Sequence, residues 1–502
     1  MILARRKSSA GILFPNTAIA AEALMNNAGL VGRAVIPPID AESPMFTRTS
    51  FLAVALSILG VALLTPLLAP EEAQAIPAFA RKYNTNCMDC HSAPPMLNAF
   101  GQRFLENGYQ LPGTEDGGST GKKKLGDLNL DDVNQYLGFR LVGNVTNSWR
   151  FKQQNPPGAA AGAVENKTEF SFPNNFVVFA GGTVAKNVGF FVELGHPVGE
   201  GGAEVERGFV TFNNLGYRDL AHLRVGKFDP NTFSSYATVR QQLGDVGESQ
   251  KGGCTAFAPC AFNRVGLSPS AFATKFYGLY DRSGNSLSPF AASLFNSGHE
   301  TGVDIHGRPF GDWFLYQVGV LNGANEHLGD SNKGKDVYGM LRFDYARSNF
   351  FSASLSGFIY QGNSNAKVQT QEDVNWNRYG LSARATYKMV DVYAAYSVDK
   401  INKTPMGVAG VFDSTATGLT VGADTYVTSQ TLVSLRYDNL DAGGMLDQRT
   451  SASFIGLQAK QFLRANVAIF ARGDFNLRQS EGGDAAARNL RNAFFSGIDV
   501  IF

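Results

Sequence analysis

The sequence predicts a mostly β protein: a 16-stranded antiparallel β-barrel of the outer membrane with a small α-helical segment in front of it. Three observations lead to this prediction: an export signal, a long series of short alternating stretches, and an aromatic residue, Phe502, at the end. Gly and Phe are abundant, and no segment after the signal is apolar enough to span a bilayer as a helix. Such an exported chain is either a large soluble β protein or a membrane barrel.

The export signal lies at residues 45–75. Arg48 gives it a positive start, an apolar core runs from Phe51 to Leu64, and Ala73-Gln74-Ala75 forms an A-x-A cleavage site. Residues 1–44 do not fit ahead of such a signal, so we interpret them as an upstream start that is not translated. The formal net charge of +1 indicates no polyanionic partner, and nucleic acid is excluded as a partner on this ground.

The barrel is predicted over residues 135–502, where short alternating stretches are separated by turn residues. Each approaches the roughly 9–11 residues that a tilted strand needs to cross a membrane. The repetition carries the prediction, because a single stretch of this kind is a weak signal. The clearest stretches are Leu137–Val145, Phe176–Val184, Leu223–Phe228, Phe314–Leu321, Val337–Tyr345, Phe351–Tyr360, Tyr379–Tyr387, Val392–Val398, Leu419–Tyr426, Thr431–Tyr437, Ala452–Ala459, Val467–Phe475 and Phe494–Phe502.

The connections between these stretches alternate between short and long. Ala346–Asn349 is one of the short ones, and Ser148–Asn166 and Asn439–Thr450 are among the long ones. Short periplasmic turns and longer external loops are the pattern of an outer-membrane barrel, whose strand number is even. The alternative is a soluble β-sandwich that happens to end in Phe.

A stretch from Asp229 to Gly298 breaks the alternation and is predicted to be an external loop between the fifth and sixth strands. Loops of this length are uncommon and often functional. Cys254 and Cys260 lie within it, and an exported pair this close predicts a small disulfide that stiffens the loop. A redox-active disulfide is the alternative.

A different cysteine pair carries the chemistry. Cys87-Met88-Asp89-Cys90-His91 has the C-x-x-C-H spacing of c-type haem attachment. In such sites the two thiols bond covalently to the haem, and the adjacent imidazole binds the iron as an axial ligand. Half of a zinc site is the alternative, but it needs a second pair of soft ligands. We therefore predict one covalently bound c-type haem on Cys87 and Cys90 with His91 as iron ligand, and no catalytic residue beyond the haem.

The haem segment is predicted to span residues 76–111. Within it, Pro95–Asn107 has the apolar spacing of a short amphipathic helix, with Pro95 suited to its first position. A segment of fewer than about 40 residues needs outside support to fold, which the haem and the rest of the chain would provide. The segment would therefore lie against or inside the barrel, and residues 112–134 would form a linker.

These residues resemble the haem segment of a known family. Ile76–Tyr83, Cys87–His91, Pro95–Gly101 and Gly108-Tyr109 are similar to fused cytochrome–porins, outer-membrane monohaem c-type cytochromes known mainly as Fe(II) oxidases. The resemblance implies a haem plug inside the barrel that takes electrons from extracellular Fe(II) and passes them to a periplasmic c-type cytochrome or similar carrier. By this resemblance the protein is an oxidoreductase, and its other partner is the lipid of the outer membrane.

The remaining candidate residues stay open. Met96 is one candidate for the sixth iron ligand, although its neighbours fit a helix core. Two functional alternatives also remain: a passive solute porin with the haem segment tethered in the periplasm, and a haem-based sensor of a small ligand. Candidates for iron contact at the outer rim or loops are His196, His299, His327, Glu193, Glu300 and Asp304, each of which is otherwise an ordinary surface residue.

Overall fold

The computed structural model of the chain describes most of the predicted segment in front of the barrel and the strands of the barrel. The chain divides into two units, residues 1–47 and 48–502, and every described residue lies in the second. The predicted upstream start and export signal, residues 1–44 and 45–75, lie outside the described residues. The described residues are 78–93, 96–111, 124–125, 128–129, 133–149, 167–197, 204–230, 300–323, 334–364, 374–401, 414–445, 448–464, 466–477 and 492–501.

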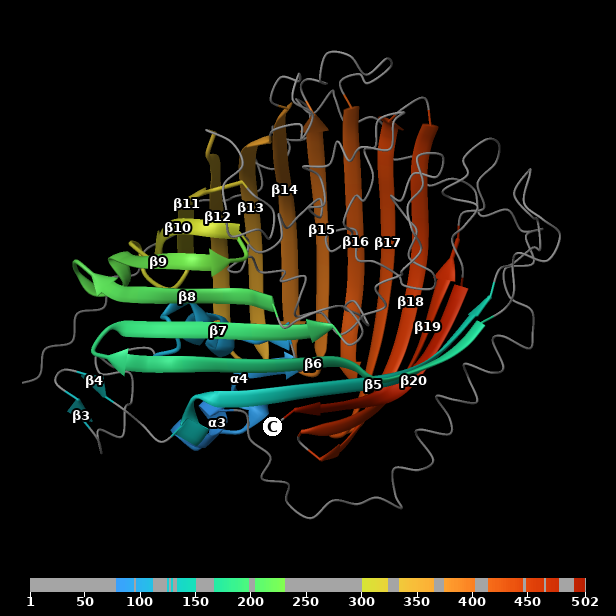
Figure 1. The fold of residues 1–502 in the computed structure, drawn as a ribbon, viewed down its shortest axis with the longest axis horizontal. Coiled ribbons are helices and arrows are strands. Elements are labelled where there is room, and N and C mark those ends of the chain that lie inside the picture. The colour runs from blue at the N-terminus through green and yellow to red at the C-terminus, as the bar shows by residue number, and fades with distance from the viewer. Residues whose placement is uncertain are drawn as a thin grey trace, which may run out of the picture. The chain divides into compact units, whose positions relative to one another are not determined.

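Sixteen antiparallel strands, β5 to β20, form one closed barrel (Figure 1). Each strand pairs with its neighbours in chain order, and β20 closes the barrel on β5 with Ile501 opposite Arg140. The predicted fold class is confirmed. The strands are β5 (Leu137–Trp149), β6 (Lys167–Ala185), β7 (Val188–Pro197), β8 (Glu204–Leu215), β9 (Ala221–Phe228), β10 (Glu300–Gly307), β11 (Phe314–Leu321), β12 (Asp336–Ser348), β13 (Phe351–Ser364), β14 (Val374–Tyr387), β15 (Val390–Ile401), β16 (Ser414–Tyr426), β17 (Thr431–Met445), β18 (Gln448–Arg464), β19 (Val467–Asn476) and β20 (Asn492–Ile501).

Most connections at one end of the barrel are long, although β17 and β18 are joined there by only two residues. The hairpins at the opposite end all close within a few residues. They join β6 to β7, β12 to β13, and β14 to β15 and their equivalents, and both β5 and β20 have their outer termini at this end. In outer-membrane barrels the short turns face the periplasm. We therefore refer to this end as the periplasmic end. The predicted loop 229–298 does link the fifth strand, β9, to the sixth, β10, but Cys254 and Cys260 lie outside the described residues.

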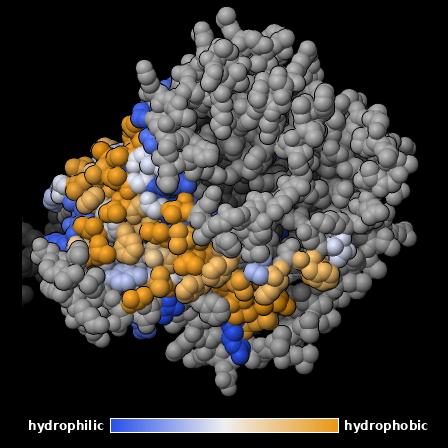
Figure 2. All heavy atoms as spheres, in the orientation of Figure 1, coloured by the Kyte–Doolittle hydropathy of each residue, from blue (hydrophilic) through white to orange (hydrophobic). Residues whose placement is uncertain are grey.

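Side chains alternate strictly between the lumen and the outside. In β12, Tyr338, Met340 and Arg342 are buried, whereas Leu341 and Phe343 are exposed. Apolar side chains outside and charged side chains inside are the reverse of a soluble protein and fit a wall that faces lipid. Figure 2 shows hydrophobic residues gathered over the outer face of the described strands.

Aromatic residues collect on the outside near the periplasmic end. Trp313 and Phe343 stack with their ring centroids 6.1 Å apart, and Phe310 and Phe314 pack against the same cluster. Such residues form the aromatic belt at the membrane interface of outer-membrane barrels. Among the described residues, no helix is both long and apolar enough to span a bilayer.

The segment in front of the barrel folds as α3 (Ala78–Tyr83), α4 (Cys87–Cys90), β1 (His91–Ala93), β2 (Met96–Leu97) and α5 (Ala99–Glu106). The prediction that one helix begins at Pro95 is wrong. Met96 and Leu97 pair with β1 instead, and the helix begins after Asn98, whose side chain accepts a hydrogen bond from the Gly101 amide. Asn98 is therefore the N-cap that sets the start of α5.

Short elements join this segment to the barrel. They are β3 (Lys124–Leu125), β4 (Leu128–Asn129) and the 3-10 helix η2 (Val133–Gln135), and a second 3-10 helix, η3 (Arg218–Leu220), lies in the turn between β8 and β9. β3 and β4 pair as a small antiparallel ladder within the predicted linker.

One predicted long connection is largely strand. Residues 439–450 were expected to form a loop, but β17 continues to Met445 and β18 begins at Gln448. The register between the two strands shifts between Asp441 and Gly444. A shift of this kind accommodates an extra residue without ending the pairing, and a Gly pair permits it.

Candidate functional site

The C-x-x-C-H motif is built as a single capped helical turn. The Asn86 side chain accepts hydrogen bonds from the Met88 and Asp89 amides, at 2.9 and 3.1 Å, and Asp89 Oδ2 accepts one from the Asn86 amide at 3.0 Å. This reciprocal capping box satisfies the amides of a helix of only one turn. It fixes the backbone that carries Cys87 and Cys90, and His91 follows with extended backbone.

Helix α5 holds this turn from behind. The buried Asn98 side chain donates hydrogen bonds to the carbonyl oxygens of Met88, at 3.1 Å, and Asp89, at 2.9 Å. Gly101 allows the close approach, because a Cβ there would lie 2.0 Å from the Cys90 carbonyl oxygen. Asn98 and Gly101, which follow the motif as N-x-x-G, therefore hold α4 against α5.

The residues present fit covalent haem attachment. Cys87 and Cys90 are free thiols rather than a disulfide, and both are partly buried, as is His91. Burial and the nearby Asp89 carboxylate raise the pKa of Cys90 to about 11. A redox-active C-x-x-C pair has a lowered thiol pKa, so the environment does not match that chemistry. Two unpaired thiols beside an imidazole are the donor set that c-type haem requires.

The zinc alternative finds no support in the described part of the chain. No group of three or more His, Cys, Asp or Glu residues there is placed to hold a metal ion. A tetrahedral zinc site requires four ligands.

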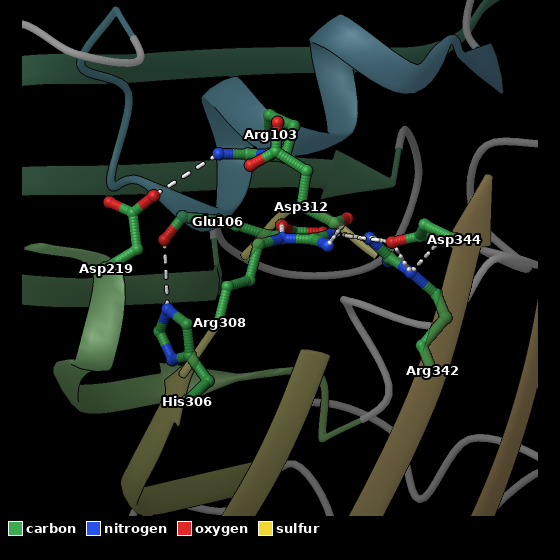
Figure 3. Close-up of polar contacts among 8 residues, drawn as sticks. All are labelled: Arg103, Glu106, Asp219, His306, Arg308, Asp312, Arg342 and Asp344. Atoms are coloured by element: carbon green, nitrogen blue, oxygen red, sulfur yellow. Dashed lines mark hydrogen bonds and ion pairs between the residues drawn. The ribbon is translucent and has the colours of Figure 1, made fainter. Parts of the chain in front are cut away.

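The segment lies inside the barrel, where its last helix is fixed by a buried charge cluster (Figure 3). The Glu106 carboxylate accepts a hydrogen bond from Arg308 Nε at 2.8 Å and forms a second ion pair with Arg342. Arg308 Nη2 and Arg342 Nε both also bind Asp344, at 2.6 and 2.9 Å. We refer to Glu106, Arg308, Arg342 and Asp344 as the Glu106 cluster.

Two further contacts flank the Glu106 cluster. Arg103 pairs with Asp219, at 3.3 Å, and with Asp312, both near short turns at the periplasmic end. His306 of β10 joins the segment through Nε2, which donates to the Glu106 carbonyl oxygen at 3.0 Å, and contacts Asp304 through Nδ1 at 2.8 Å. The end of α5 is thus fixed to β10, β12 and two turns.

The other side of the segment is fixed to β14. Arg384 Nη1 donates to the Leu97 carbonyl oxygen at 2.6 Å and Nη2 to Ser92 Oγ at 2.8 Å. The same guanidinium is held by the Asp391 carboxylate of β15, with Nε donating at 2.8 Å. Arg384 is buried, and the Asp391 carboxylate compensates its charge. The remaining N–H groups of the Arg384 guanidinium bind the segment.

Aromatic packing completes the contact with the wall. Tyr109 stacks on Phe79, at 4.9 Å, and on Phe191 of β7, at 5.4 Å between ring centroids. The Phe209 ring of β8 also stacks on Tyr109, and the Phe104 ring packs edge-on against Tyr109. The apolar residues of the segment therefore bury against the lumen wall as well as against one another.

The Glu106 cluster predicts a pH dependence. Burial alone would raise the pKa of Glu106, but the charges of Arg308 and Arg342 outweigh it and lower the pKa to about 2. A carboxyl with a lowered pKa stabilises the folded state above its ordinary value of 4.5, and this contribution is lost as the pH falls towards 2. We expect the segment to be held with constant strength at neutral pH and to loosen between these two values.

Limited pepsin digestion across this pH range measures that loosening. Cleavage within residues 78–111 of the wild type should rise steeply as the pH falls, relative to an unfolded reference peptide. The Glu106→Gln variant lacks the carboxyl whose pKa is lowered, and should not show the step that Glu106 causes. An identical pH profile in both proteins would contradict the assignment to Glu106.

The other predicted residues have structural partners or lie outside the described part. Asp304 binds Arg224 and Tyr338, and Glu193 pairs with Arg207. Glu300 and Met96 are buried, and Met96 lies in β2. His196 is in β7 but its side chain is not described, and His299 and His327 lie outside the described residues.

Sequence reasoning missed the residues that fix the segment in the lumen. Glu106, Arg308, Arg342 and Arg384 carry no motif. The signal for Arg342 and Arg384 was available in the alternation, because each is a charged residue between two outward-facing apolar or small residues of a predicted strand. Such a residue must point into the lumen and find a partner there.

Several solved outer-membrane proteins are similar to this chain. No protein-family model and no curated protein sequence matches the chain. Among solved structures, the chain is similar to an anion-selective porin from Comamonas acidovorans, with 14% identity over 73% of this chain and 98% of that one and a TM-score of 0.46. It is also similar to the outer-membrane channel DcaP of Acinetobacter baumannii (10%, 76% and 99%, 0.45) and to Salmonella typhi OmpF (12%, 73% and 97%, 0.44).

The closed barrel, its apolar outer face and its aromatic belt determine where the protein resides. Only helices and closed barrels satisfy all backbone groups in lipid, and barrels of this kind belong to outer membranes. The chain is a 16-stranded β-barrel protein of the outer membrane.

Proposed function

We propose that the protein is an outer-membrane electron-transfer protein that oxidises extracellular Fe(II). Cys87 and Cys90 would hold one c-type haem covalently, and His91 would bind its iron. Each Fe(II) gives up one electron and leaves as Fe(III), and one electron passes to a one-electron carrier in the periplasm. The enzyme class is accordingly an Fe(II):cytochrome c oxidoreductase.

The observation that supports this proposal is the fixation of the motif inside the barrel. The segment from α3 to α5 is held by the Glu106 cluster on one side and by Arg384 on the other. A tethered periplasmic carrier has no need of buried ion pairs to the lumen wall, because it must move to meet its partners. The arrangement therefore favours a fixed conduit over a passive porin with a tethered cytochrome.

The chain's own residues would hold the haem in place and separate it from the lipid. When bound, haem supplies a centre that accepts and releases one electron. Cys87 and Cys90 fix it covalently, and Asn98 and Gly101 set the position of the turn that carries them. The strand wall separates this site from lipid, and the polar lumen surrounds it with fixed charges. Protein groups of this kind tune a haem through its ligands, burial and hydrogen bonds.

Extracellular iron as the donor rests on the resemblance of residues 76–109 to fused cytochrome–porins and on one chemical argument. Fe(III) formed at neutral pH precipitates, so its formation outside the cell keeps mineral out of the periplasm. A haem-based sensor of a small ligand remains a second reading of the motif, and it predicts a vacant or easily displaced sixth ligand position.

Anaerobic stopped-flow spectroscopy tests the proposal. Purified, haem-loaded protein is mixed with Fe(II), and the haem absorbance is followed. We expect rapid reduction in the wild type and its loss in His91→Ala, with Met88→Leu as the control in the same turn. Reduction by dithionite but not by Fe(II) would overturn iron as the donor, and ready binding of carbon monoxide to the reduced protein would favour the sensor.

A further inference from the structure

Basic residues mark several of the turns at the periplasmic end of the barrel. Arg347 lies next to the end of β12, Lys388 lies in the turn between β14 and β15, and Arg464 ends β18, and all three are exposed. We refer to these three residues as the basic rim. Lys186 is also exposed at this end, in the turn between β6 and β7, but the three residues of the basic rim lie close to the motif.

Arg347 and Lys388 lie on neighbouring turns. The Lys388 amide donates to the Phe350 carbonyl oxygen at 2.7 Å, and the Tyr426 amide donates to that of Met389 at 3.2 Å, so successive turns are in direct contact. Adjacent hairpins in a barrel repeat every two strands, which is about 10 Å. A single small partner can therefore meet several of these side chains at once.

The C-x-x-C-H motif lies directly behind these turns. Asn349 Nδ2 donates to the Asp89 carbonyl oxygen at 3.4 Å, and Tyr426 OH contacts Met88 Sδ at 3.7 Å. Met88, between the two cysteines, is 40% exposed. The part of the motif that is open to its surroundings is thus next to the basic rim.

No exposed acidic side chain is described on the same turns. Three nearby carboxylates are paired with arginines or buried: Asp344 binds Arg308 and Arg342, Asp391 binds Arg384, and Asp424 is 1% exposed. Across the opening, Asp219 and Asp312 pair with Arg103. Asp89 of the motif is partly exposed and its carboxylate is bonded by the neutral Asn86, so it offsets one of the three positive charges. Among the described residues the basic rim therefore keeps a net positive charge.

Apolar side chains lie between the basic residues. Phe350, Met389 and Val427 are exposed on three successive turns. An apolar centre bordered by charges of one sign is a common form of transient electron-transfer interface, where contact area is small and charge guides the encounter.

We propose that the basic rim is the docking surface for an acidic one-electron carrier protein of the periplasm. The inference rests on the proposed function, because it identifies the partner that receives the electron. Docking here would bring the carrier against the exposed edge of α4. Opposite charges would raise the rate of encounter, and salt would lower it.

Binding to two forms of one probe tests the inference. The probe is a small basic c-type cytochrome, used as such and after succinylation, which converts its lysine amines to carboxylates. Association with the immobilised, haem-loaded protein in detergent is followed at low and high salt. We expect the succinylated form to bind and the basic form not to bind. Arg347→Glu with Lys388→Glu should slow association of the succinylated form by about tenfold.

A matched control makes the same charge change at the other end of the same strands. Lys335 and Lys400 are exposed at the long-connection ends of β12 and β15. Lys335→Glu with Lys400→Glu alters net charge equally and should leave binding unchanged. Equal losses in both double variants would overturn the inference, because they would show an effect of net charge alone.

Anionic lipid is the other possible occupant of these side chains. If Arg347→Glu with Lys388→Glu weakens binding to vesicles that contain phosphatidylglycerol but leaves the succinylated cytochrome unaffected, the rim contacts headgroups and the inference is wrong. The binding measurement does not use Fe(II) as an electron donor. A failure of Fe(II) to reduce the protein would therefore leave a positive docking result intact, and the two proposals fail separately.

Discussion

Replacing Glu106 with glutamine is expected to free the haem segment from the barrel wall. Glutamine keeps the shape of the side chain but leaves the guanidinium groups of Arg308 and Arg342 facing a neutral amide. Removing one partner of a buried ion pair costs about 3–5 kcal/mol. Because Asp344 still pairs with both arginines, we expect about 3 kcal/mol, the lower end of that range.

Two measurements report on this change. Trypsin should cleave residues 78–111 of Glu106→Gln much faster than those of the wild type, while the barrel stays resistant. In planar bilayers the variant should also show larger and more frequent channel openings, because the segment no longer stays in the lumen.

Asp312→Asn is the matched control for the loss of one carboxylate that pairs with the same helix. Asp312 pairs with Arg103, but its side chain is 84% exposed, and exposed ion pairs contribute little. Its protease resistance and conductance should remain those of the wild type. If Glu106→Gln also behaves like the wild type, the aromatic contacts of Tyr109 hold the segment without help from the Glu106 cluster.

The barrel could be predicted from the sequence because its signal is local. The described residues of all 13 stretches named from alternation lie on strands, since an alternating pattern follows directly from one face in lipid and one in the lumen. The strands β7, β8 and β10 were counted but not delimited. They contain Gly, His and Pro near their ends, and β10 follows the long loop directly.

Strand lengths were less predictable. β6 begins at Lys167, nine residues before the predicted Phe176, and Pro173 lies within it. Proline breaks the pattern because it cannot donate to a ladder. The register between β5 and β6 shifts at this level, between Val142 and Asn144, so the ladder accommodates a residue that sequence rules would exclude.

The candidate site likewise has a part that the sequence predicts and a part that it does not. Cys87, Cys90 and His91 are given by a motif, and the capping residues Asn86 and Asn98 are typical of helix starts. The residues that fix the motif in place come from β10, β12 and β14, more than 200 positions away. No local pattern connects Glu106 with Arg342, because their contact depends on the closure of the barrel and on which side of each strand faces the lumen.

Replacing both Cys87 and Cys90 with serine is expected to abolish covalent haem while leaving the barrel folded. The two thioether bonds are the only covalent links that the motif provides, and a single Cys→Ser change should leave one of them. The 16 strands close through their own backbone hydrogen bonds, so barrel formation does not depend on the cofactor. Denaturing gels stained for haem peroxidase activity should lose their signal, while the heat-dependent mobility shift of a folded barrel should persist.

Met88→Leu is the control, because Met88 lies between the cysteines and offers no thiol. It should keep full haem staining. Cys254→Ser with Cys260→Ser should keep it as well, since those cysteines lack a following histidine. Staining that survives the loss of Cys87 and Cys90 would place the haem elsewhere and remove the basis for an electron conduit. Loss of the barrel itself would mean that the segment is needed for the strands to close, because the Glu106 cluster, His306 and Arg384 tie the segment to β10, β12 and β14.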